Sequence, residues 1–86
     1  MSLPSRTVPS VEPPTLGQRL RNLRTDNGWT LAELASRSGT SVSYLNDLEH
    51  DRTVPSLSKL QSIAESYGLD ASLILRGVKT FGLLQP

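Results

Sequence analysis

Residues 30–50 read TLAELASRSGTSVSYLNDLEH, and the pattern of this stretch decides the fold. Thr30 and Glu33 have the spacing of a capping box, in which a hydroxyl and a carboxylate each bind a free backbone N–H at the start of a helix. Leu31, Leu34 and Ala35 then recur at helical spacing and predict one buried face. The first part of the stretch is therefore expected to be a short amphipathic helix.

A tight turn and a second short helix are expected to follow. Gly39 predicts the turn, because glycine adopts the left-handed conformation that ends many helices. Its small size also leaves room where two steeply crossing helices meet. Thr40 or Ser41 can cap the second helix, at about 41–50, and Leu45 and Leu48 predict its buried face. The stretch is thus expected to form a helix-turn-helix.

The flanking sequence predicts three more helices. A second capping box, Thr15 with Gln18, begins a helix over about 16–26. Two further helices are expected at about 57–67 and 71–76. The expected buried positions of these three helices are Leu16, Leu20, Leu23, Leu57, Leu60, Ile63, Ala64, Tyr67, Leu73 and Ile74. The expected fold class is all-α, a compact bundle of five helices.

Composition limits the chain to one small domain. It has 86 residues, of which 36% are hydrophobic. No window approaches the run of about 18 apolar residues that a membrane-spanning helix requires. There is no cysteine, so disulfides and thiolate metal sites are excluded. The first residues lack the apolar stretch of a signal peptide, and we expect a cytoplasmic protein that makes no membrane contact.

The two ends of the chain are expected to lie outside the folded domain, which spans residues 15–76. Residues 1–14 contain four of the six prolines and predict an extended or disordered arm. The tail, residues 77–86, contains four apolar residues that an isolated domain would shelter poorly: Val78, Phe81, Leu83 and Leu84. We expect this tail to be a dimer contact or a linker to a further domain.

Few residues are available for catalysis. His50 is the only histidine, so neither a histidine-based metal site nor a cysteine nucleophile has the partners it needs. The carboxylates of Asp47, Glu49 and Asp51 are clustered in sequence, but their spacing spreads them over different faces of a helix end. A solvated or ion-paired helix end explains them. We expect no enzyme activity, no metal and no cofactor.

Three segments of the chain together resemble the phage-repressor type of helix-turn-helix domain, the Xre- or Cro-like family. They are LRNLRTDNGWT at 20–30, LAELASRSGTSVSYLNDLEH at 31–50 and RTVPSLSKLQSIAESYGLD at 52–70. Their order is that of the family, which makes the match more specific than any single motif. The resemblance implies a five-helix bundle of the lambda-repressor-like DNA-binding type. It also implies a regulator of transcription, a repressor for example, that binds double-stranded operator DNA.

The resemblance further implies which residues would contact DNA. The helix at 41–50 would lie in the major groove, and the preceding helix would cross the DNA backbone. The implied base-contacting residues are Ser41, Val42, Ser43, Asn46 and Asp47. The implied phosphate-contacting residues are Thr30, Arg37, Tyr44, His50, Arg52, Thr53 and Lys59.

The implied base-contacting side chains differ in what they could read. Asn46 could form a bidentate pair with adenine, Val42 could contact a thymine methyl, and Ser43 could donate to or accept from several bases. Asp47 could accept from cytosine N4, but phosphates would also repel its carboxylate. Both interpretations of Asp47 stay open.

Three further residues are assigned to structure. By resemblance, Arg24 and Glu49 form a buried ion pair that locks two helices together. Trp29 directly precedes the capping residue Thr30, where a large apolar side chain packs against the entry of a helix. Stacking on nucleic acid is the alternative role for Trp29.

We expect the chain to act as a homodimer on a two-fold operator, since a single recognition helix on a neutral domain would bind weakly. Between residues 16 and 76, seven basic residues meet seven acidic ones. This balance favours another class of function, a protein-interaction module such as an antitoxin or a corepressor that keeps the fold without strong DNA binding. The intact caps, turn and loop favour DNA.

Overall fold

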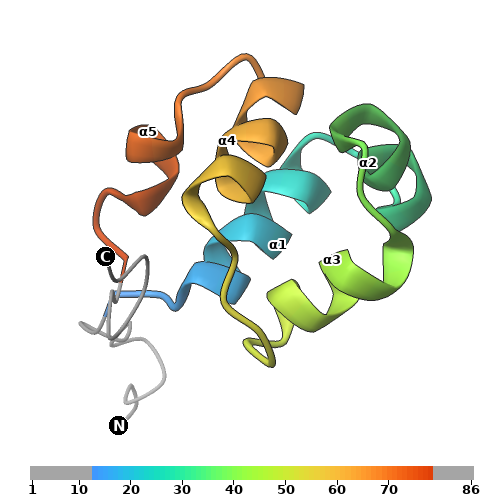
Figure 1. The fold of residues 1–86 in the computed structure, drawn as a ribbon. Helices are drawn as coiled ribbons and strands as arrows, with labels where there is room; N and C mark the ends of the chain where they lie inside the picture. Colours follow the sequence, from blue (N-terminus) through green and yellow to red (C-terminus); the bar gives the residue numbers. More distant parts are fainter. Residues whose placement is uncertain (1–12, 79–86) are drawn as a thin grey trace, which may run out of the picture.

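The computed structural model describes residues 13–78 of the chain. They form five α-helices: α1 (Leu16–Asp26), α2 (Leu31–Ser38), α3 (Val42–Glu49), α4 (Leu57–Ser66) and α5 (Ala71–Leu75) (Figure 1). Residues 13–78 contain no β-strand. The predicted all-α fold is therefore confirmed, whereas most of the predicted arm and tail lies outside the described residues.

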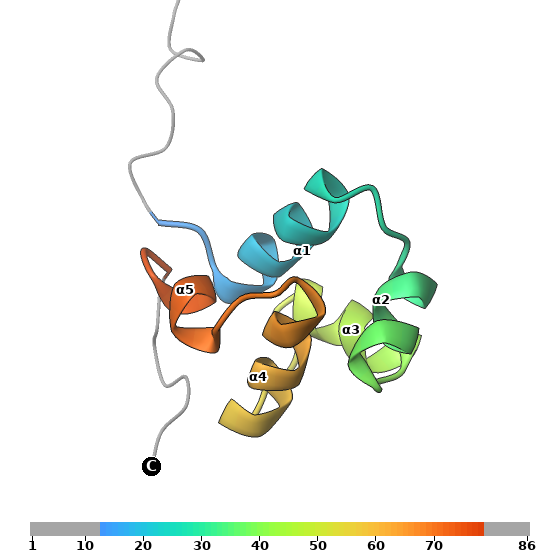
Figure 2. The same ribbon diagram turned by 90° about the horizontal axis from the view of Figure 1, so that it is seen from above.

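The helices pack as a closed ring of neighbours (Figure 2). α1 packs against α3 and α5, α2 packs against α3 and α4, and α4 contacts α5. One side of α3 thus packs against α1 and α2, and its other side is exposed to solvent. No helix in the described part of the chain is long and apolar enough to cross a membrane.

Side-chain caps begin the helices as the sequence predicts. Complete capping boxes are present at the starts of α1 and α2. Of the two candidates at the start of α3, Ser41 rather than Thr40 is the cap, and its hydroxyl accepts from the Tyr44 N–H at 3.0 Å. At α5, hydrogen bonds from the hydroxyl and the backbone N–H of Ser72 hold the pKa of the Asp70 carboxyl below its usual range.

The turn between α2 and α3 depends on backbone conformation rather than on space. Gly39 has a φ of +69°, in the left-handed region. A Cβ atom built at this position would meet no atom within 4 Å. The expectation that Gly39 relieves a collision between the two helices is therefore wrong, and the left-handed turn alone explains the glycine.

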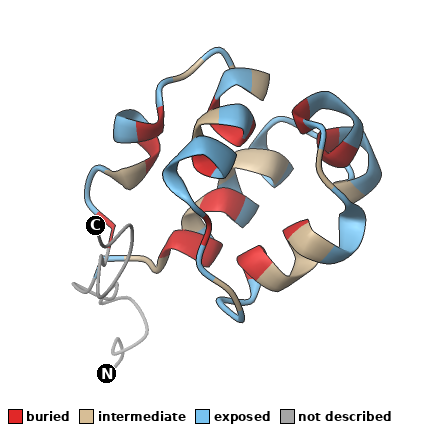
Figure 3. Cartoon of the chain, in the orientation of Figure 1, coloured by how far each residue is buried: buried red, intermediate tan, exposed pale blue. Residues whose placement is uncertain are grey.

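The core is aliphatic and lies where the five helices face one another (Figure 3). Its fully buried side chains are Leu34, Leu45, Leu48, Pro55, Leu60, Ile63 and Ile74. Because all seven are apolar, burial of these residues needs no compensating hydrogen bonds from side chains.

Three predictions about burial are wrong. Leu57 is exposed because it lines an open groove between α4 and α5 instead of packing in the core. Leu73 is exposed because the five-residue α5 turns Ala71 and Ile74 inward instead. Val78, expected to be poorly sheltered, is buried, since its N–H donates to the Leu75 carbonyl at 3.2 Å and the chain turns back onto the core.

Trp29 has the predicted packing role. Its ring stacks on the ring of Tyr67, the C-terminal cap of α4, with ring centroids 4.8 Å apart and ring planes 17° from parallel. The guanidinium carbon of Arg37 lies 4.3 Å from the Trp29 ring centroid, a cation–π distance. The stack fastens the entry of α2 to α4.

Candidate nucleic-acid interface

α3 has an inner face in the core and an outer face turned to solvent. Leu45, Leu48 and Glu49 are buried on the inner face. The outer face comprises the five predicted base-contacting residues, Ser41, Val42, Ser43, Asn46 and Asp47; the first three are exposed and the other two half-buried. Helical periodicity explains the grouping of the four residues within α3, because positions three or four apart share one side of a helix, and Ser41 precedes them as the N-cap. The structure therefore brings all five onto one surface.

Asp47 is paired with a cation at the edge of the outer face. Its Oδ1 lies 3.4 Å from Nη1 of Arg52, and both side chains are about half exposed. The backbone reinforces this proximity, because the Arg52 N–H donates to the Asp47 carbonyl at 2.9 Å. An ion pair this exposed contributes roughly 0–1 kcal/mol to stability. It does, however, place a positive charge beside the one carboxylate of the outer face.

Tyr44 holds a second cation near α3. The ammonium group of Lys59, in the first turn of α4, lies 5.8 Å from the Tyr44 ring centroid. Burial raises the pKa of the Tyr44 phenol, which is already neutral at physiological pH at its ordinary value. Lys59 and Arg52 are thus both positioned by side chains of α3.

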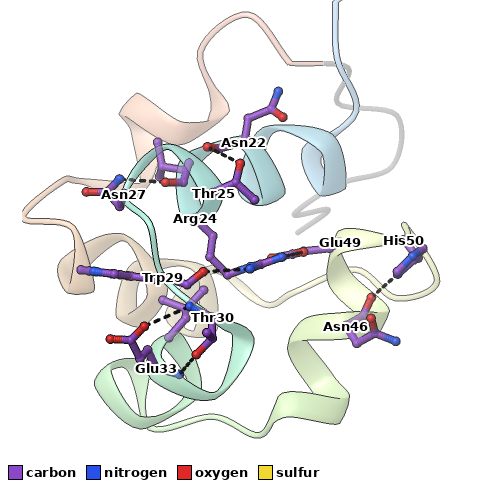
Figure 4. A network of polar contacts seen from close by, with 12 residues as sticks. Asn22, Arg24, Thr25, Asn27, Trp29, Thr30, Glu33, Asn46, Glu49 and His50 are labelled. Atoms are coloured by element: carbon purple, nitrogen blue, oxygen red, sulfur yellow. Dashed lines mark hydrogen bonds and ion pairs between the residues drawn. The ribbon is translucent and has the colours of Figure 1, made fainter.

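His50 closes the C-terminal end of α3. Its Nδ1 lies 2.8 Å from the Asn46 carbonyl oxygen (Figure 4). A carbonyl oxygen only accepts, so Nδ1 must carry a proton and Nε2 is left to face solvent. The backbone N–H of His50 donates to the same carbonyl at 3.2 Å. The side-chain amide of Asn46 is not used in these contacts.

Two predicted phosphate ligands, Thr30 at the N-cap of α2 and Arg37 within α2, already have partners in the protein. The Thr30 hydroxyl accepts from the Glu33 N–H at 3.0 Å, and the Thr30 N–H donates to the Glu33 carboxylate at 3.1 Å (Figure 4). Arg37 lies over Trp29. Thr53 is half-buried in the loop before α4. The structure thus gathers the predicted phosphate ligands Tyr44, His50, Arg52 and Lys59 around α3, and engages those of α2 elsewhere.

Arg24 and Glu49 form the pair that the resemblance implies. Arg24 donates from Nε to Oε2 of Glu49 at 2.7 Å and from Nη2 to Oε1 at 2.9 Å, while its Nη1 donates to the Trp29 carbonyl at 2.9 Å (Figure 4). The side chains are 13% and 4% exposed. The hydrogen bond to Glu49 raises the pKa of Arg24. This bidentate pair ties the end of α3 to α1.

Sequence reasoning missed a second tie between α3 and α1. The Asp51 carboxylate, just after α3, accepts hydrogen bonds from Thr15 and from the Gly17 N–H at the start of α1. Gly17 packs directly on the end of α3. Asp51 is 36 positions from Thr15 and 34 from Gly17, and no local pattern links them. The one available signal was a glycine inside a predicted helix, which often marks a close approach.

The geometry defines the class of protein. Two short helices joined by a left-handed turn, the second with a buried inner face and a polar outer face, form a helix-turn-helix. A family model described as a helix-turn-helix domain matches residues 15–76, and the chain belongs to that family.

Two curated relatives are named as a transcriptional regulator and a repressor. The HTH-type transcriptional regulator DdrOP3 of Deinococcus deserti is 46% identical over 67 residues, a match that covers 78% of this chain and 52% of the relative. The immunity repressor protein of Bacillus phage phi105 is 41% identical over 61 residues, covering 71% of this chain and 42% of the repressor. The chain therefore spans about half the length of the curated relatives it matches.

A solved structure has the same fold. The crystal structure of SinR, a master regulator for biofilm formation, in complex with DNA superposes with a TM-score of 0.66 and 31% identity. The match covers 71% of this chain and 98% of that chain. The resemblance to the phage-repressor type of helix-turn-helix domain is thereby confirmed.

Proposed function

We propose that this chain is the DNA-binding part of a transcriptional regulator and that α3 reads sequence in the major groove. The observation that carries the proposal is the outer face of α3, which lies beside two cations, Arg52 and Lys59, that α3 itself positions. The relatives support it, because they are named as a transcriptional regulator and a repressor, and SinR was crystallised with DNA. Such a regulator works in the cytoplasm and performs no catalysis.

The outer face would supply the base contacts. Asn46 would pair with adenine, Val42 would contact a thymine methyl, and Ser41 and Ser43 would donate to or accept from base edges. Asp47 has a third role besides the two left open by the sequence, because its carboxylate holds Arg52. In that role the Asp47 carboxylate is partly neutralised by Arg52, and it helps to orient the Arg52 side chain for a phosphate contact.

The phosphate contacts would come from both sides of α3. Arg52, Thr53 and His50 would bind one stretch of backbone, and Lys59 with Tyr44 a second. Thr30 and Arg37 would contribute from α2, with Arg37 using the outer edge of a guanidinium already packed on Trp29. A charge-assisted contact of this kind positions the protein without reading sequence.

A homodimer would place two copies of α3 on a two-fold operator, with half-sites about 34 Å apart. Its contact would use the α5 side of the domain, where a groove of about 620 Å³ between α4 and α5 is lined in part by the apolar Leu57 and Leu75. Val78 cannot take part, because it is buried in the core. The other expected tail contacts, Phe81 and Leu83, lie outside the described residues.

A protein-interaction module is the second candidate function. Two observations favour it: the equal numbers of acidic and basic residues between 16 and 76, and the exposure of Val54, Leu57 and Leu73. A neutral domain gains little from counterion release, the term that supplies most non-specific DNA affinity.

Selection from a random-sequence DNA pool with the purified protein, at two salt concentrations, separates the two functions. A DNA-binding domain enriches one motif, and it retains more DNA at the lower salt concentration. Recovery of no motif at either concentration would reject the DNA-binding proposal and leave the interaction module.

A further inference from the structure

We infer that Asp51 is a positioning residue, whose carboxylate latches the segment after α3 onto the start of α1 and thereby holds Arg52 in place for DNA. The first half of this inference concerns the folded protein alone. The second half rests on the proposed function.

The backbone at Asp51 adopts a conformation that is uncommon for residues other than glycine. Its φ is +58°, and it is the one non-glycine residue between 13 and 78 with a positive φ. Four glycines in the same part of the chain adopt this region, where a Cβ atom crowds the backbone of any other residue. Aspartate tolerates this region better than most residues, but glycine fits it without strain, so the contacts of the Asp51 side chain are what favours aspartate over glycine here.

The contribution of the side chain is visible in its hydrogen bonds. Oδ1 of Asp51 accepts from the Gly17 N–H at 2.9 Å, and Oδ2 accepts from the Thr15 hydroxyl at 2.6 Å. The Gly17 N–H is one of the first N–H groups of α1, which have no partner within the helix. The Thr15 hydroxyl itself accepts from the Gln18 N–H and caps the same helix. Asp51 thus supplies α1 with a second cap from a distant part of the chain, and a carboxylate is favoured at this positive end of the helix dipole.

Gly17 shows that the two elements are in direct contact. A Cβ atom built on it would lie 2.5 Å from the Leu48 carbonyl oxygen, 2.7 Å from the Glu49 carbonyl oxygen and 2.8 Å from Oδ1 of Asp51. The first turn of α1 therefore abuts the last carbonyls of α3, and only glycine permits this approach. Together with the Arg24–Glu49 pair, the latch attaches the end of α3 to α1 at two points.

The latch affects DNA binding because the next residue is Arg52, a proposed phosphate ligand. Arg52 has just two described contacts, both to Asp47, and its side chain is 60% exposed. Without the carboxylate of Asp51, the segment that carries Arg52 and Thr53 would have to be ordered on binding. That ordering weakens affinity for every sequence alike, since it removes no base contact.

Asp51→Gly and Asp51→Asn test the latch by thermal unfolding and by amide hydrogen exchange of Gly17. If the contacts of the Asp51 side chain contributed no stability, Asp51→Gly would relieve the backbone strain and raise the melting temperature. The latch predicts the opposite: a melting temperature lower by roughly 4–8 °C and faster exchange at Gly17. Asp51→Asn should be intermediate, because its amide oxygen still accepts from Gly17 and asparagine, like aspartate, tolerates positive φ. Glu65→Gln, an exposed change on α4, is the control.

DNA binding of the same variants, measured well below every melting temperature, tests the positioning role. Removing a negative charge near phosphates should by itself tighten binding. The inference predicts instead a loss of affinity of about 3–10-fold for Asp51→Gly on selected and unrelated sequences alike, with partial rescue by Asp51→Asn.

An Asp51→Gly protein that melts at or above the wild-type temperature overturns the latch, and one that binds DNA as tightly as wild type overturns the positioning role. If the wild-type protein binds no DNA, the proposed function and the positioning role fail, while melting and exchange still decide the latch.

Discussion

The inner and outer faces of α3 belong to one short helix and its N-cap but are built in opposite ways. On the inner face, Leu45 and Leu48 are fully buried and Glu49 makes two hydrogen bonds to Arg24. On the outer face, Val42 is 44% exposed and the sole side-chain pair among the described contacts, Asp47 with Arg52, is solvent-exposed. The comparison teaches that the fold constrains one side of this helix tightly and leaves the other free to carry function.

The largest effect is expected on the inner face, from Glu49→Ala. Removing this carboxylate strands a buried guanidinium, which costs on the order of 3–5 kcal/mol of unfolding free energy. Denaturant unfolding should show it, with Glu65→Ala on the surface of α4 as the control. A Glu49→Ala protein as stable as the control would mean that the pair does not fasten the inner face.

A smaller but still clear loss is expected from Gly17→Ala. Alanine favours a helix interior over glycine by about 1 kcal/mol, so an open site would be stabilised. Here the added methyl would collide with the carbonyls of Leu48 and Glu49, and we expect a net loss of roughly 1–3 kcal/mol. Asn22→Ala, at an exposed position of α1, provides the control in the same unfolding experiment. A stabilised Gly17→Ala protein would contradict the close contact.

On the outer face, Ser43→Ala and Asn46→Ala should leave stability nearly unchanged and alter recognition. Each should lose roughly 1–3 kcal/mol of discrimination at particular base pairs. Competition binding with single-base variants of the selected sequence measures this loss. An equal loss on every sequence would show that these residues do not read bases.

The smallest effect is expected at Tyr67, in the core behind the helix-turn-helix. Its hydroxyl has no hydrogen-bond partner among the described residues, so Tyr67→Phe should leave the stability at pH 7 unchanged or raise it by up to about 1 kcal/mol. Burial, and the nearby charge of Glu49, raise the pKa of Tyr67 from 10.0 to about 12. The folded state therefore keeps this proton while the unfolded state loses it, and wild-type stability should fall as pH rises from 10 towards 12. Unfolding of Tyr67→Phe over that range should show a shallower fall; an equal fall would contradict the assignment.

The sequence predicted the inner face well and the distant contacts poorly, for physical reasons. Caps such as Thr15 and Thr30 depend on residues three positions away, so local spacing reveals them. Exposed Leu57 and buried Val78 depend on which neighbouring element covers them, and hydrophobicity alone carries no such information.

The candidate site shows the same division between local and distant information. The five residues of the outer face share one side because of helical periodicity, which the sequence displays. The partner of Asp47, the stacking of Arg37 on Trp29 and the latch at Asp51 each join separate elements, and they required the three-dimensional arrangement.

The central claim is that the outer face reads bases while its flanking cations bind phosphates. Affinities of the wild-type protein, Arg52→Ala and Asn46→Ala for the selected sequence and for a scrambled duplex, measured over a series of salt concentrations, test it most directly. We predict that Arg52→Ala weakens binding to both duplexes and lowers the salt slope by about one unit. Asn46→Ala should weaken only the selected sequence and leave the salt slope unchanged. A wild-type protein with no preference between the duplexes at low salt, together with an Arg52→Ala protein that binds like wild type, would contradict the claim.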